Sequence, residues 1–180
     1  MRKLLAVLCF ASACSLAFAA NSSAVTKAYV DDKGTVHIVT DDGQDHAIQS
    51  EKGQEKGKGG VEKIQIAPDG KAVGWLVNLW ASCCVSYAIP FELIVWQSGH
   101  VVRRVHPGMA IWSWAFIGNG KELAYRSRPL HGGWSGECTL VDVATGKELG
   151  SWDHPVDENG NDTDESDESS GKPDWAKQVP

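Results

Sequence analysis

After its first twenty residues the sequence has no apolar run of the roughly 18 residues that a membrane-spanning helix requires. It also lacks an excess of positive charge, since 17 basic residues stand against 23 acidic ones and the formal net charge is −6. Residues 21–152 are close to neutral, with 14 acidic and 13 basic residues. We therefore expect a chain that is not transmembrane and has no nucleic-acid or anionic-membrane partner.

Motifs for catalysis and metal binding are equally scarce. Ser135 lies among glycines, but the Gly-x-Ser-x-Gly pattern of a nucleophile elbow fails at Glu137, and we expect no helix to follow. The six histidines lack the close pairing of a zinc site. Residues 157–168 place oxygen-bearing side chains at calcium-loop spacing, yet Asp162 stands where the sharp turn of that loop needs glycine. We therefore predict no metal, no cofactor and no evident catalytic site.

Residues 1–20 have the layout of a secretory signal peptide. Arg2 and Lys3 precede an apolar run, and small residues lead to a cleavage site near Ala19/Ala20. The residues before Cys14 weakly resemble a lipoprotein signal, but the usual leucine three residues earlier is missing, so lipidation is the less favoured alternative. We expect a periplasmic or secreted protein.

Three cysteines lie beyond the signal peptide: Cys83, Cys84 and Cys138. In an oxidising compartment we expect a disulfide between Cys138 and one of the other two. On the chain-entropy model this bond closes a loop of about 55 residues and stabilises the fold by about 4 kcal/mol. Three roles stay open for the remaining cysteine: burial, a bond to another chain, or a rare vicinal disulfide between the adjacent pair.

Short apolar runs, rich in Val, Ile, Trp and Tyr and separated by Gly, Asp and Asn, predict an all-β fold. Within residues 21–50 we expect a three-stranded meander. Its strands are predicted at 25–30, 35–40 and 45–49. Residues 51–60 contain no apolar side chain and predict a flexible linker.

Residues 61–152 contain two copies of one pattern, about fifty residues apart. The first copy opens its second strand with Pro-Asp-Gly-Lys at 68–71, and the second does so with Asn-Gly-Lys-Glu at 119–122. Each copy predicts four strands, which is the content of one propeller blade. We expect these strands near 63–66, 72–78, 92–97, 101–106, 111–117, 122–128, 138–143 and 148–152.

The turn at 68–71 and the turn at 142–147, Asp-Val-Ala-Thr-Gly-Lys, resemble those of the WD40-like β-propeller repeats in TolB-type and related secreted bacterial proteins. The resemblance covers about residues 61–152, and residues 35–49 resemble the last hairpin of a further blade. It implies blade-like four-stranded antiparallel meanders in a partial propeller of about two and a half blades, whereas a ring typically needs four to eight. Three solutions stay open: oligomerisation, an open stack with covered edges, or a β-sandwich. The chain also resembles small secreted bacterial proteins, a likeness that implies no activity.

In both repeats the connection between the second and third strands is expected at one end of the fold, where loops often form binding surfaces. Arginine and tryptophan are preferred anchors at interfaces, and an aromatic face beside a guanidinium suits sugars or anionic groups. Four residues near these connections are therefore the candidate binding residues: Arg126, Arg128, His131 and Trp134. Trp112 and Trp114 are expected on one face of a strand, either in the core or as an exposed aromatic strip.

We predict a secreted or periplasmic binding module, not an enzyme, for a protein, small-molecule or glycan ligand. One alternative is a hydrolase-like or lyase-like enzyme that uses His131 with Glu137 or Glu92. Another is a structural subunit that forms a homo-oligomer through unpaired sheet edges. Residues 153–180 predict an acidic disordered tail, because seven acidic residues lie between 157 and 168 without an intervening base.

Overall fold

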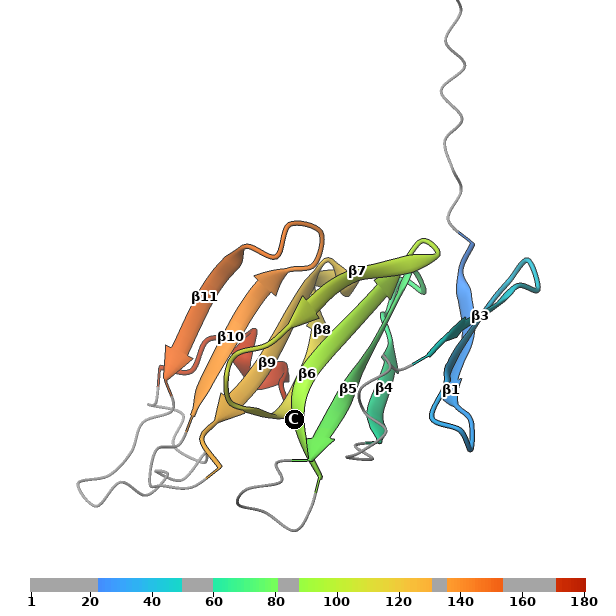
Figure 1. The fold of residues 1–180 in the computed structure, drawn as a ribbon. Helices are drawn as coiled ribbons and strands as arrows, with labels where there is room; N and C mark the ends of the chain where they lie inside the picture. The colour runs from blue at the N-terminus through green and yellow to red at the C-terminus, as the bar shows by residue number, and fades with distance from the viewer. Residues whose placement is uncertain (1–22, 50–59, 81–87, 131–135, 154–170) are drawn as a thin grey trace, which may run out of the picture.

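The computed structural model describes residues 23–49, 60–80, 88–130, 136–153 and 171–180 (Figure 1). These residues form eleven strands, arranged in three antiparallel sheets. The all-β prediction is therefore confirmed. In the part of the chain that the structure describes, we find no helix with the length and hydropathy needed to cross a membrane. The predicted signal peptide and nearly all of the predicted linker lie outside the described residues.

Each sheet is a meander in which the strands follow one another in chain order. The N-terminal sheet contains β1 (Val25–Val30), β2 (Val36–Thr40) and β3 (Asp45–Ile48). The middle sheet contains β4 (Val61–Ile66), β5 (Ala72–Trp80), β6 (Ala88–Gln97) and β7 (His100–Val105). The C-terminal sheet contains β8 (Ala110–Ile117), β9 (Glu122–Arg128), β10 (Glu137–Asp142) and β11 (Glu148–Asp153). Every strand that the sequence predicts is present, with bounds that differ by a few residues.

Local side-chain contacts explain why the turns form where the sequence places them. The carboxylate of Asp142 accepts hydrogen bonds from the backbone N–H and the hydroxyl of Thr145, both at 2.6 Å, and these bonds lower the pKa of Asp142. Arg103 of β7 donates to the carbonyl oxygens of Val143 at 3.1 Å and Ala144 at 2.6 Å. This arginine therefore ties the middle sheet to the turn between β10 and β11.

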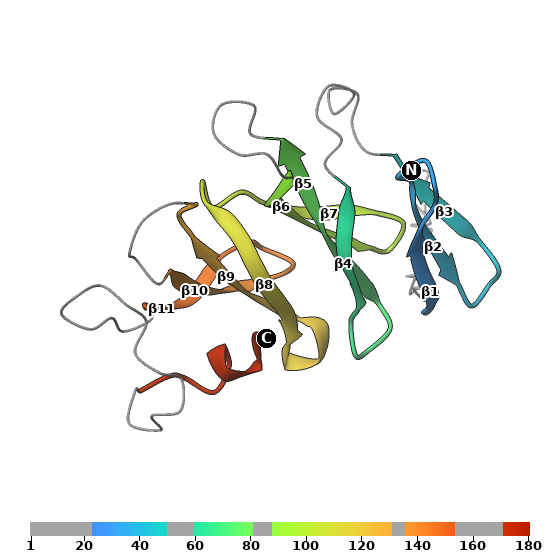
Figure 2. The same cartoon turned by 90° about the horizontal axis from the view of Figure 1, so that it is seen from below.

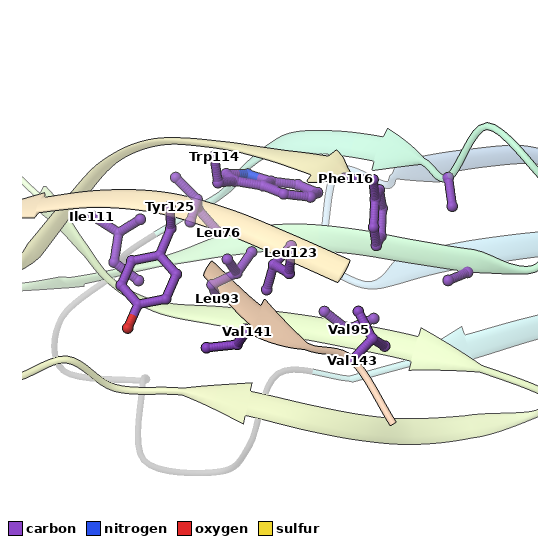
Figure 3. Close-up of a cluster of buried hydrophobic side chains, with 12 residues drawn as sticks. Leu76, Leu93, Val95, Ile111, Trp114, Phe116, Leu123, Tyr125, Val141 and Val143 are labelled. Carbon is purple, nitrogen blue, oxygen red and sulfur yellow. The ribbon is translucent and has the colours of Figure 1, made fainter. Parts of the chain in front are cut away.

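The middle sheet lies between the other two (Figures 1 and 2). Apolar side chains fill both interfaces. Against the N-terminal sheet, Trp75 and Trp96 pack with Val36 and Ile38. Figure 3 shows the core formed between the middle and C-terminal sheets. Its largest members include Leu76, Leu93, Val95, Ile111, Trp114, Phe116, Leu123 and Tyr125.

Gly74 permits the close approach of the middle and C-terminal sheets. Trp114 is 1% exposed and lies directly over this glycine. A Cβ added at position 74 would lie 2.5 Å from Cη2 of the Trp114 indole, closer than carbon atoms can approach without displacement. Packing between these two sheets thus explains the glycine at position 74.

The two outer faces of this stack differ in chemistry. On the N-terminal sheet the outer face is polar: His37 stacks on Tyr29, with ring centroids 5.0 Å apart, and its Nδ1 lies 3.0 Å from the Asp45 carboxylate. On the C-terminal sheet the outer face is apolar, and residues 171–180 pack against it (Figure 2). The described sheets therefore leave neither outer face as a large bare apolar surface.

Residues 171–180, here called the C-terminal segment, differ from the predicted disordered tail. They contain the 3₁₀ helix η4 (Ala176–Gln178), and Val179 is buried against Ile117, Ala124 and Leu140. Trp175 packs on the same cluster. The apolar side chains at 175, 176 and 179 explain the difference, because burying them favours order where the acidic run before them does not. Residues 154–170 lie outside the described residues.

Candidate functional site

A cavity of about 270 Å³ opens where β4, the β8–β9 hairpin and the C-terminal segment meet. It lies on the side of the C-terminal sheet that carries the C-terminal segment. We call it the basic pocket. Its lining residues are Lys63, Trp112, Ser113, Arg126, Arg128 and Pro180.

Lys63 reaches the pocket because of a bulge in β4. The pairing of β4 with β5 shifts register between Glu62 and Gln65, and Lys63 within this bulge has a φ of 51°. Its ammonium group donates a hydrogen bond to the carbonyl oxygen of Trp112. Two residues later, Nε2 of Gln65 donates to the carbonyl of Trp114 at 3.1 Å. Side chains of β4 therefore donate hydrogen bonds to two carbonyl oxygens of β8. One of these side chains, that of Lys63, also brings a positive charge to the pocket.

Trp112 faces the pocket because of a second bulge. The register of β8 against β9 shifts between Ile111 and Ser113, so the extra residue breaks the alternation along the strand. Trp114 points into the core between the sheets, whereas Trp112 is half-buried and lines the pocket. The prediction that the two tryptophans share one face is therefore wrong. A bulge of one residue sends them to opposite sides.

The two arginines come from alternate positions of β9. Arg126 and Arg128 lie two residues apart and thus project from one face of the strand. The Arg128 guanidinium carbon lies 4.2 Å from the centroid of the Trp112 ring, a cation–π contact. Stacking of this kind holds a guanidinium in place while its in-plane N–H groups remain available for hydrogen bonds. The indole Nε1 of Trp112 is buried and has no hydrogen-bond partner among the described residues.

Three of the six lining residues have a cationic side chain and none has an acidic side chain. Positive charges gathered in a concave site attract anions more strongly than the same charges dispersed over a surface. The sum of charges over the body of the chain is nearly neutral, so this local concentration is a property of the fold. The pocket is therefore suited to an anionic group.

The pocket lies at the end of the molecule where the sequence predicts the binding loops. The last residues of β5 and β9 and the first residues of β6 and β10 share this end (Figure 1). Of the predicted binding residues, the structure brings Arg126 and Arg128 together, while His131 and Trp134 lie outside the described residues. Sequence reasoning missed Lys63 and Pro180, because each comes from a segment distant along the chain.

Of the two carboxylates considered for the enzyme alternative, Glu92 has other partners among the described residues. Glu92 is buried, and its Oε1 accepts from Nη1 of Arg104 at 2.8 Å and lies 3.1 Å from Nε2 of His106. Burial is the main cause that raises the pKa of Glu137 on β10, and the nearby negative charge of Asp153 adds to it. His131 is outside the described residues, so the enzyme alternative stays a prediction.

Cys138 lies in β10, opposite Arg126 on β9, and is buried. It is the only cysteine among the described residues, since Cys83 and Cys84 lie outside them. The disulfide and the pairing of Cys138 therefore stay predictions.

No protein-family model matches this sequence, and no curated protein is significantly similar to it. The resemblance to WD40-like propeller repeats consequently stays a prediction. Function is therefore inferred from the pocket.

Proposed function

We propose that this protein is a periplasmic or secreted binding module whose basic pocket holds an oxyanion group of its ligand, a carboxylate or a phosphate. The observation that carries the proposal is the meeting of Lys63, Arg126 and Arg128 around one cavity with no acidic side chain in its lining. The predicted signal peptide supports the compartment. The near neutrality of residues 21–152 supports recognition of one anionic group over binding of a polyanion.

The geometry of Arg128 favours a directional contact. A guanidinium presents its N–H groups in a fixed fork that matches the two oxygens of a carboxylate or phosphate. Because Trp112 already stacks on it, less side-chain entropy is lost when the anion binds. Lys63 supplies a compact charge from β4 of the middle sheet. The pocket thus combines one oriented donor with two further cations.

The size of the pocket limits what it holds. Its volume of about 270 Å³ lies just below the range of about 300–1,000 Å³ that is typical of sites enclosing a whole drug-sized ligand. We therefore propose that it binds an anionic group, while the remainder of the ligand extends over the neighbouring surface. The half-buried Trp112 ring offers an apolar border for that remainder.

The backbone of Lys63 offers separate support. A non-glycine residue at positive φ costs on the order of 1–3 kcal/mol, and such strain gathers at functional sites. Here the strained residue is one whose ammonium group reaches the pocket.

Isothermal titration of the mature protein with inorganic phosphate and with glucuronate tests the proposal and separates a phosphate from a carboxylate. We expect saturable binding of at least one probe, weakened by added salt. The variant Arg128→Lys keeps the charge but loses the fork and the stacking, and should bind about tenfold or more weakly, since a charge-assisted hydrogen bond contributes about 1.5–3 kcal/mol.

Lys71→Ala is the matched control, because it removes one positive charge from an exposed turn remote from the pocket. It should bind like the wild type. Absence of binding to both probes at low salt would contradict the proposed function. So would unchanged affinity in Arg128→Lys together with a loss in Lys71→Ala, since this would show a diffuse charge effect.

A further inference from the structure

We propose that Trp175 and Val179 are positioning residues of the basic pocket: they dock the C-terminal segment so that Pro180 forms one wall, and pocket occupation and docking stabilise each other. This inference rests on the proposed function and adds to it how the site is assembled. It assigns a binding role to a part of the chain whose composition predicts a disordered tail.

The first observation is the place of Pro180. This residue lines the pocket together with Trp112 and Arg128, although it is more than fifty positions away from both in sequence. The preceding residue, Val179, is only 8% exposed and belongs to the apolar cluster on the outer face of the C-terminal sheet. Burial of Val179 therefore fixes the position of its neighbour at the pocket.

The second observation is how the segment is held. Trp175 lies against β11, where a Cβ added at Gly150 would be 3.7 Å from the indole Cζ2. Ala176 is fully buried, and the Lys172 ammonium lies 5.6 Å from the centroid of the Trp152 ring. The segment thus crosses the outer face from β11 to the pocket beside β8, anchored largely by apolar contacts.

The third observation concerns the local structure of the segment. Its described backbone hydrogen bonds join its own residues, such as Ala176 N–H to Pro173 O at 2.9 Å and Val179 N–H to Ala176 O at 3.2 Å. A three-residue 3₁₀ helix has too few such bonds to be stable in isolation. The turn therefore depends on docking, and so does the wall that Pro180 provides.

Thermodynamic linkage then follows. A ligand that contacts a wall present only in the docked state binds that state more tightly, and so it shifts the segment towards docking. Conversely, a change that undocks the segment lowers the apparent association constant in proportion to the fraction of molecules that remain docked. The two effects must have the same coupling constant.

The test uses the predicted mature chain, residues 21–180, with inorganic phosphate as the probe. Val179→Ala removes buried methyl groups and should shift the docking equilibrium by about tenfold. Trp175→Ala removes the larger anchor. We expect both variants to bind phosphate more weakly than the wild type, and saturating phosphate to slow hydrogen exchange at the amides of Ala176 and Val179 in the wild type.

Leu149→Ala is the matched control: it removes an apolar side chain that is 45% exposed on β11, and it should leave phosphate affinity unchanged. Pro180→Gly removes the wall without touching either anchor. It should lower affinity while leaving the melting temperature and the exchange of Ala176 unchanged, so it keeps the test valid even if an anchor variant unfolds.

Each outcome separates the two claims. If the wild type binds neither phosphate nor glucuronate, the proposed function itself fails. If the wild type binds phosphate and the anchor variants and Pro180→Gly bind it equally well, with no change in hydrogen exchange, only the positioning role is overturned. Tighter binding by the variants would overturn it as well, because the segment would then obstruct the pocket.

Discussion

Replacing Gly74 with alanine tests how closely the middle and C-terminal sheets pack. The added Cβ would lie 2.5 Å from Cη2, 2.9 Å from Cζ3 and 3.3 Å from Cζ2 of Trp114. The indole has little room to move, since it is 1% exposed and packs edge-to-face with Phe116 at a centroid distance of 5.3 Å. We expect destabilisation of about 1–3 kcal/mol, the usual cost of overpacking a core.

Urea and thermal unfolding measure this cost. At about 2–4 °C per kcal/mol for a chain of this size, the melting temperature should fall by about 2–12 °C. Gly60→Ala is the control, because a Cβ at that position meets no atom within 4 Å. A Gly74→Ala protein as stable as the control would refute the close approach of the two sheets.

A double-mutant cycle identifies the clashing partner. Trp114→Phe removes the ring atoms that the new Cβ would meet, and in the wild-type background it should destabilise the protein by leaving a cavity. In the Gly74→Ala background the same substitution should cost less or restore stability. Strictly additive effects would show that the strain from the added methyl group is not relieved at Trp114.

Two further predictions concern contacts at the surface of the stack. Arg103→Ala removes the charged group that donates hydrogen bonds to two carbonyl oxygens of the turn after β10. It should lower the free energy of unfolding in urea by about 1–3 kcal/mol. The same loss in Lys147→Ala, on that turn, would contradict a specific role of these hydrogen bonds. The hydrogen bond to Asp45 raises the pKa of His37 above its ordinary value of 6.5. The stabilisation by protonated His37 is therefore fully present below the pKa of the unfolded state and is lost as pH rises through the folded pKa. The wild type should therefore lose more stability than His37→Gln between about pH 6 and pH 8.5. NMR titration should find the His37 pKa above its ordinary value. Melting temperatures that change in parallel for the two proteins across that range would contradict this role of His37.

The strands could be predicted because their signals are local. Aspartate and glycine in the turns at 68–71 and 142–147 fix where each hairpin reverses, and the apolar runs between turns fix the strands. The order in which strands pair could also be predicted from the sequence, since neighbouring strands of a meander are neighbours along the chain. The sequence predicts the connections from β5 to β6 and from β9 to β10 at the same end of the fold. The strand ends that flank them do lie at one end of the molecule (Figure 1).

The pocket could be predicted only in part, because it depends on contacts between distant segments. The arginines at 126 and 128 form an alternating pair on one strand, which the sequence shows directly. Lys63 carries no such signal, since its approach requires a bulge in β4 and the docking of β4 on the edge of β8. The bulge at Trp112 likewise has no simple sequence signal.

The C-terminal segment shows a different kind of error. The acidic composition of residues 157–168 does not extend to the end of the chain, because the last ten residues contain two apolar anchors, Trp175 and Val179, four positions apart. That spacing is a usable signal. Composition averaged over a long tail conceals it.

The most direct test of an oxyanion in the basic pocket is an NMR titration of the ¹⁵N-labelled mature protein with inorganic phosphate and, separately, glucuronate. The Nε–H signal of Arg128 and the indole Nε1–H signal of Trp112 should shift together and saturably with at least one anion, at the dissociation constant found by calorimetry. The indole signals of the buried Trp75 and Trp114 should stay in place. Saturable binding that shifts other residues and leaves Arg128 and Trp112 unchanged would contradict the account.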